Sequence, residues 1–161
     1  MKRLDLTIFS RLVLCLAAFL SVSALSAAPL AVGDTFPQWT DMTDQHEAVY
    51  GIPQSTQHIA VAFTMSVGKA ANRYLTEQGK DFLPTKHAIF VANIYGMPGI
   101  GRFFAMPKMK KYPHRIMLAD AEGLLDAFPQ KDDKVTVFEL GPKGVIEVIS
   151  FWDPKSETNL F

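Results

Sequence analysis

Residues 58–78 have the sequence HIAVAFTMSVGKAANRYLTEQ, and the pattern of apolar residues changes part-way along it. The first part, from His58 to Thr64, is apolar on both alternating faces, which is typical of a β-strand covered on two sides. From Gly68 to Gln78 the apolar residues recur at helical spacing, and Gly79 follows as a helix stop. This stretch therefore predicts a buried strand followed by a helix.

Further strands follow along the chain. The apolar run at residues 88–94 comes after a connection long enough for a crossover, so we expect it to lie parallel to the first strand. Residues 115–119 predict a short third strand. Residues 134–140 and 145–152 flank a Gly-Pro-Lys-Gly turn and predict an antiparallel hairpin. We therefore predict an α/β domain with a mixed central sheet, in which parallel core strands precede a C-terminal hairpin.

The remaining segments carry weaker signals. Residues 39–50 mix polar and isolated apolar residues, which favours a surface strand pair or a loop. Pro98 can start a helix, and residues 124–128 predict about one and a half helical turns. The helix after Pro98 would carry one short apolar stripe, formed by Ile100, Phe103, Phe104 and Met106.

The composition excludes several classes of protein. The 16 Lys and Arg residues balance the 16 Asp and Glu residues, so the chain lacks the bulk positive field of a nucleic-acid-binding protein. Its one cysteine, Cys15, lies in the first apolar run, which rules out an intrachain disulfide framework, a zinc ribbon and a paired-thiol redox centre. A length of 161 residues with 48% hydrophobic residues fits one domain plus a targeting segment.

The N-terminal segment has the order of a secretory signal peptide: a basic start, an apolar run and then small residues. We predict a signal peptide at residues 1–26, cleavage near Ala27, and a domain at residues 27–161 that is periplasmic or secreted. The alternative is an uncleaved membrane anchor, because Leu12 to Val32 has no charged residue and is long enough to cross a bilayer. Membrane contact is expected only in that case.

The order of these elements resembles the thioredoxin-like superfamily, most closely the exported TlpA-like oxidoreductases and the peroxiredoxins. The resemblance covers about residues 31–152. It is carried by the opening Val32-Gly-Asp-Thr-Phe-Pro with Asp44-Gln-His, by the passage from Val61 to Ala71, and by the Asp120-Ala-Glu-Gly turn that precedes the hairpin. It implies a thioredoxin-like three-layer fold.

The resemblance also implies a redox constellation that this chain lacks. In that family the turn after the first core strand holds a Cys-x-x-Cys pair or one peroxidatic cysteine, and alignment places Gly68 and Ala71 at the two cysteine positions. The family's cis-proline should lie around Val135 and Thr136, where this sequence has no proline. Thiol chemistry of the family's kind is therefore not expected from this chain.

The family usually closes with a helix, but here only residues 153–161 follow the hairpin, so any C-terminal helix is shortened. We therefore expect the sheet face near Phe151 and Trp152 to be incompletely covered. Such a face would be available as an interface to another exported protein or to a second copy of this chain.

The other candidate residues give weaker indications of a functional role. Ser66 lies just before the expected helix start, where it favours helix capping over a role as a nucleophile, and Lys69 could hold an anion or a partner. The four histidines form no ligand pair at helical spacing, and the methionines fit ordinary packing better than a copper site. Residues 108–111 predict a solvated basic patch. We predict no metal site, no cofactor and no nucleic-acid partner.

These observations favour an exported, non-catalytic, thioredoxin-like binding or scaffold protein. The alternative is a redox auxiliary that handles disulfides or peroxides with a partner's thiols. A carrier of a small ligand in the groove above Gly68 is a third possibility.

Overall fold

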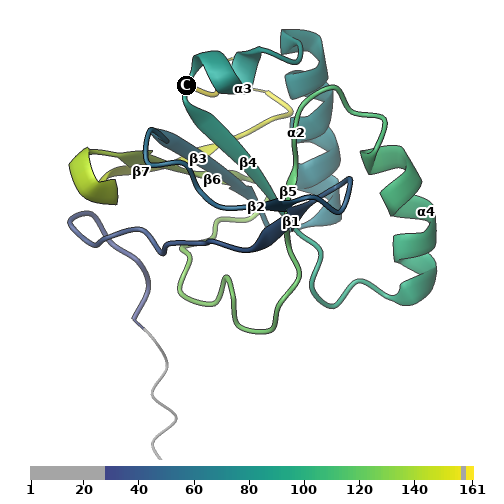
Figure 1. Ribbon diagram of the computed structural model, residues 1–161, viewed down its shortest axis with the longest axis horizontal. Helices are drawn as coiled ribbons and strands as arrows, with labels where there is room; N and C mark the ends of the chain where they lie inside the picture. The colour runs from purple at the N-terminus through teal and green to yellow at the C-terminus, as the bar shows by residue number, and fades with distance from the viewer. Residues whose placement is uncertain (1–27, 157–158) are drawn as a thin grey trace, which may run out of the picture.

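The computed structural model describes residues 28–156 and 159–161, which fold around one seven-stranded mixed sheet (Figure 1). The strands are β1 (Met42–Asp44), β2 (Val49–Tyr50), β3 (His58–Ala62), β4 (Ala88–Asn93), β5 (Met117–Ala119), β6 (Val135–Leu140) and β7 (Ile146–Trp152). Their order across the sheet is β2-β1-β5-β4-β3-β6-β7. The helices are α2 (Met65–Gln78), α3 (Phe82–Thr85) and α4 (Gly99–Met109), and a short 3-10 turn, Pro142–Gly144, joins β6 to β7.

The predicted sheet is confirmed in its pairing. Strand β3 lies parallel to β4, β4 lies parallel to β5, and β6 and β7 form an antiparallel hairpin. The register of β3 and β4 places Ala62 beside Ala92, so the carboxyl ends of these two strands lie at the same edge of the sheet. Helix α2 starts at this edge, directly after β3.

Helix α2 begins earlier than expected. Its first residue is Met65 and its N-cap is Thr64, whose Oγ1 accepts a hydrogen bond from the Val67 N–H at 3.3 Å. The expectation that the helix starts at Gly68 and that Ser66 caps it is wrong, because the threonine hydroxyl already satisfies a free N–H of the first turn. At the other end the stop at Gly79 is confirmed, with φ at +91° and its N–H bonded to carbonyls of the last turn.

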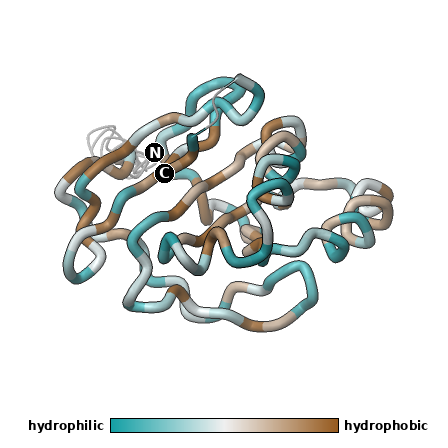
Figure 2. The backbone as a smooth tube through the Cα atoms, turned by 90° about the horizontal axis from the view of Figure 1, so that it is seen from above, coloured by the Kyte–Doolittle hydropathy of each residue, from teal (hydrophilic) through white to brown (hydrophobic). Residues whose placement is uncertain are grey.

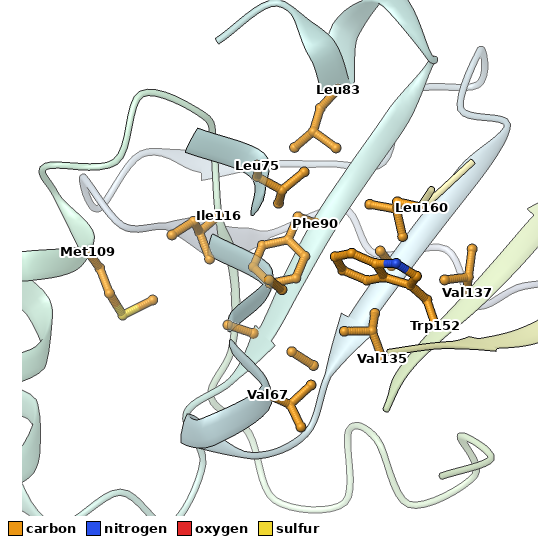
Figure 3. Packing of buried hydrophobic residues seen from close by; sticks show 14 of the residues in the cluster. Val67, Leu75, Leu83, Phe90, Met109, Ile116, Val135, Val137, Trp152 and Leu160 are labelled. Carbon is orange, nitrogen blue, oxygen red and sulfur yellow. The ribbon is translucent and has the colours of Figure 1, made fainter. Parts of the chain in front are cut away.

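One face of the sheet packs against α2 (Figure 2, Figure 3). Ala60 and Ala62 alternate with Ile59 and Val61 along β3, so each pair points to a different hydrophobic cluster. On the α2 side these small residues let the helix approach closely. The larger members of this cluster are Val67, Leu75, Phe90, Ile116 and Trp152.

The expectation of an uncovered face at Trp152 is wrong. The Trp152 side chain is only 3% exposed, and its ring lies 4.9 Å from the ring of Tyr74 in an edge-on contact. Leu160 joins the same cluster, so chain beyond β7 covers this end of the sheet (Figure 3). No helix follows β7 within residues 153–156 and 159–161. Phe151, on the opposite side of β7, is half-buried, and an interface there stays a prediction.

The second face of the sheet is covered by irregular chain. Phe36, Trp39, Phe128 and Phe138 form an aromatic cluster in which Trp39 stacks on Phe128 with ring centroids 5.5 Å apart. Phe138 belongs to β6, and the other three rings come from the segment before β1 and from the loop before β6, which lies below the sheet in Figure 1. The helical turns expected at residues 124–128 are wrong, because this segment is a series of turns held by bonds such as Phe128 N–H to Leu125 C=O.

Candidate functional site

A cleft of about 90 Å³ opens between α2 and α4, above the carboxyl ends of β3 and β4. Its walls are mostly apolar. The apolar lining is Ala62, Met65, Gly68, Ala92, Ile94, Met97, Ala105, Met109 and Tyr112. The polar lining is Thr64, Lys69, Asn72, Asn93 and Lys108.

The cleft exists because α4 touches the body at few points. Met109 is the only residue of α4 that is buried, and the helix stands beside the sheet at the right of Figure 1. Arg102 holds it in place: its guanidinium donates to the Ile94 carbonyl at 3.1 Å and pairs with Asp120. Small side chains at Gly68 and Ala105 then leave room between the two helices.

The two positions aligned with the redox cysteines lie inside α2 and not at its start. Gly68 and Ala71 are buried, and a Cβ at Gly68 would meet the Ala62 Cβ at 3.9 Å. Gly68 lines the cleft, whereas Ala71 packs in the core. Ser66 and Lys69 are both exposed, and they also line a shallow hollow on the outer side of α2.

The region aligned with the cis-proline is part of a regular strand. Val135 and Thr136 begin β6 and are fully buried. The Thr136 hydroxyl donates to the Pro129 carbonyl at 2.7 Å, and Val135 pairs across the strands with Trp152. These residues therefore serve the packing of the sheet, in a strand that is paired on both sides.

The thiol position can be tested by placing a single cysteine in a Cys15→Ser chain. Ser66→Cys lies exposed on the first turn of α2, where free N–H groups and the helix dipole stabilise a thiolate, so its pKa should fall below about 8.5. Gly68→Cys lies two residues later at a buried position, so its pKa should rise above that value. The measurement is the pH dependence of iodoacetamide alkylation. Faster alkylation of Gly68→Cys at neutral pH would contradict the helix start at Met65.

A buried polar pair lies beneath the cleft and was not predicted. The His114 Nε2 lies 2.8 Å from the Asn72 Oδ1, across 42 residues of sequence, and Asn72 also lines the cleft. With this oxygen as acceptor the ring proton is on Nε2. His114 is 2% exposed, and burial lowers its pKa to about 4, so the imidazole is neutral at pH 7.

Two more contacts hold His114 in place. The ring of Tyr112 stacks on it with centroids 5.6 Å apart, and the His114 carbonyl accepts a hydrogen bond from the buried Gln45 side chain at 2.8 Å. The Nδ1 atom has no hydrogen-bond partner within the part of the chain that the structure describes. The sequence shows His114 as one of four isolated histidines. It does not show the contact with Asn72, because the two residues lie far apart along the chain.

The chemistry available in the cleft is that of a binding surface. Thioether and aromatic groups from Met65, Met97, Met109 and Tyr112 can pack against an apolar ligand, and the lysines lie at the rim. Within residues 28–156 and 159–161, no three His, Cys, Asp or Glu side chains are grouped so that they could hold a metal ion.

Comparison with solved structures shows a thioredoxin-like fold. A peroxiredoxin-like protein from Aquifex aeolicus superposes with a TM-score of 0.53 at 11% identity, covering 80% of each chain. The thioredoxin domain of a thiol-disulfide oxidoreductase from Bacteroides vulgatus superposes with a TM-score of 0.51 at 16% identity, covering 78% of this chain and 92% of that domain. No protein-family model matches the sequence, and no curated protein matches it. The likeness therefore concerns the fold.

Proposed function

We propose that this chain is an exported, non-catalytic binding module that holds an apolar segment of another protein in the cleft between α2 and α4. One observation carries this proposal. At the start of α2, where the resemblance implies a redox thiol, the chain places a methionine-lined cleft, and its single cysteine is Cys15.

The side chains of the cleft suit such a ligand. Met65 is 50% exposed on the first turn of α2, so its thioether is available to a partner. Met97 and Tyr112 are half-buried on the facing wall. Methionine adapts its shape to irregular apolar surfaces, which is why it is common where a protein accepts varied partners.

The competing function is that of a redox auxiliary acting with a partner's thiols. It draws only on the fold shared with a thiol-disulfide oxidoreductase and a peroxiredoxin-like protein. A fold can host unrelated functions, so this argument is weaker than the one from the cleft itself.

Assays of disulfide reduction and thiol peroxidase activity separate the two functions. We expect both activities to stay at background, in the natural chain and in Cys15→Ser, because no side chain of the domain can form a mixed disulfide or a sulfenic acid. Activity that persists in Cys15→Ser would contradict the proposal and favour the auxiliary.

Binding is tested with a photo-crosslinking residue at Met65, in the cell envelope of the organism that makes the protein. We expect a discrete crosslinked protein from Met65 and none from the matched position Val148, which is 40% exposed on β7. Ala105→Leu fills the cleft from α4 and should reduce the crosslink by about tenfold, since it displaces apolar contact. Equal crosslinking from Met65 and Val148 would contradict the assignment to the cleft.

A further inference from the structure

Helix α4 exposes an apolar face that no part of the described chain covers. Ile100 is 69% exposed, Phe103 is 72% exposed and Phe104 is 60% exposed. Their spacing places all three on the outer side of the helix, opposite the buried Met109. The two phenyl rings contact each other edge-on with centroids 5.3 Å apart. In Figure 2 this helix lies at the right margin of the molecule.

The charged residues of the segment that carries this face are all basic. No Asp or Glu occurs between Ile94 and Ala119, whereas the same segment holds several basic residues. Three of them are paired with acids from elsewhere: Arg102 with Asp120, Lys110 with Glu47 and Arg115 with Asp44.

Two lysines are left for an outside partner. Lys108 and Lys111 are exposed, and their side chains make no ion pair within the described residues. Both line the same surface hollow as Phe103 and Phe104. Exposed aromatic rings and unpaired ammonium groups are therefore adjacent on the surface formed by α4 and the residues directly after it.

We infer that α4 docks on the surface of an anionic lipid bilayer. Ile100, Phe103 and Phe104 enter the boundary between headgroups and acyl chains, and Lys108 and Lys111 contact lipid phosphates. A helix with a compact apolar face and flanking lysines is the arrangement that lies in the plane of such an interface. This contact does not depend on an uncleaved leader, and it does not rest on the function proposed for the cleft.

The helix lies on the bilayer and does not cross it. Helix α4 has 11 residues, about half of what a transmembrane helix needs. In the part of the chain that the structure describes, no helix has the length and apolar content to pass through a membrane.

The charges favour lipid over a second copy of the chain. In a symmetric pair of α4 helices, no acidic residue of the Ile94 to Ala119 segment would be available to pair with Lys108 and Lys111 of the other copy. An anionic bilayer instead supplies a phosphate for each ammonium group.

A site-specific fluorophore tests this contact in the full chain carrying Cys15→Ser. One variant carries an environment-sensitive label on Ile100→Cys, and the matched control carries it on Val148→Cys, which is exposed on the far strand β7. The probes are vesicles of phosphatidylcholine, alone or mixed equally with phosphatidylglycerol. We expect a blue shift and quenching by acyl-chain quenchers only for the label at Ile100 and only with phosphatidylglycerol. A leader that anchors the chain cannot imitate this result, because it would not bury one label selectively.

Charge and aromatic variants complete the test. Lys108→Gln with Lys111→Gln should lower the insertion constant about 30-fold, since each basic residue near an anionic surface is worth about fivefold. Phe103→Gln with Phe104→Gln should abolish the shift. The control pair Lys86→Gln with Lys143→Gln, on exposed sites away from α4, should leave it unchanged.

Several outcomes would overturn the inference. They are an equal shift at both labels, insertion into phosphatidylcholine alone, loss of the signal on adding soluble glycerol phosphate, and a dimer in ultracentrifugation that Phe103→Gln with Phe104→Gln dissociates. Each of these leaves the crosslinking result at Met65 unaffected, so failure here is distinguishable from failure of the proposed function.

Discussion

Replacing Trp152 with alanine is expected to lower the free energy of unfolding by about 3–5 kcal/mol. The indole is 3% exposed and lies in the cluster with Leu75, Phe90 and Leu160, so truncation leaves a large cavity that the rigid sheet cannot close. It also removes the edge-on contact with the Tyr74 ring.

Urea denaturation followed by circular dichroism measures this loss. The matched control is Phe151→Ala, the half-buried neighbour on the opposite side of the same strand, for which we expect about 1 kcal/mol, since much of its ring keeps solvent contact. The loss of unfolding free energy for Trp152→Phe should lie between the losses for these two variants. If Trp152→Ala lowers the free energy of unfolding by no more than Phe151→Ala does, this face is open. That result would agree with the prediction from the sequence and contradict the structure.

The buried His114 is expected to make the protein sensitive to mild acid. Burial lowers its pKa in the folded state to about 4 from an ordinary value of 6.5, so between these two pH values the unfolded chain binds a proton that the folded chain does not. The stability that His114 contributes is therefore complete above pH 6.5 and is lost as the pH falls toward 4. The expected loss is about 3 kcal/mol.

The measurement is the free energy of unfolding at several pH values for the natural chain and for His114→Gln. Glutamine keeps a donor for the Asn72 Oδ1 but does not titrate, so the difference between the two curves should change by about 3 kcal/mol between pH 7 and pH 4. The control His46→Gln removes an exposed imidazole and should leave the acid sensitivity in place. Parallel curves for the natural chain and His114→Gln would refute the assignment of this loss to His114.

The parts of the fold that the sequence predicts well are those set by neighbours along the chain. The alternation at His58 to Ala62, the stop at Gly79 and the Gly-rich turn between β6 and β7 each act within a few residues. The predicted start of α2 is wrong because Thr64 and Ser66 are both good N-cap residues. Only the backbone conformation at Thr64 shows which of the two caps the helix.

The candidate site was less predictable because it depends on how one helix is placed. The stripe of Ile100, Phe103 and Phe104 has the spacing of a core-facing helix surface, yet it faces solvent. The Arg102 contacts with the Ile94 carbonyl and Asp120 set the orientation of α4, and no periodicity reveals a contact of that kind. No periodicity reveals the hydrogen bond between His114 and Asn72 either, because these residues lie far apart in sequence.

Composition and local spacing were sufficient to establish a mixed α/β sheet and a chain whose one cysteine is Cys15, because they depend only on residue identity and on short-range backbone geometry. Tertiary packing alone decided that Trp152 is covered, that His114 is buried and uncharged, and that α4 turns its aromatic residues outward. Burial is a property of contacts between segments distant in sequence, and it sets both the pKa of a side chain and the surface that a partner can reach.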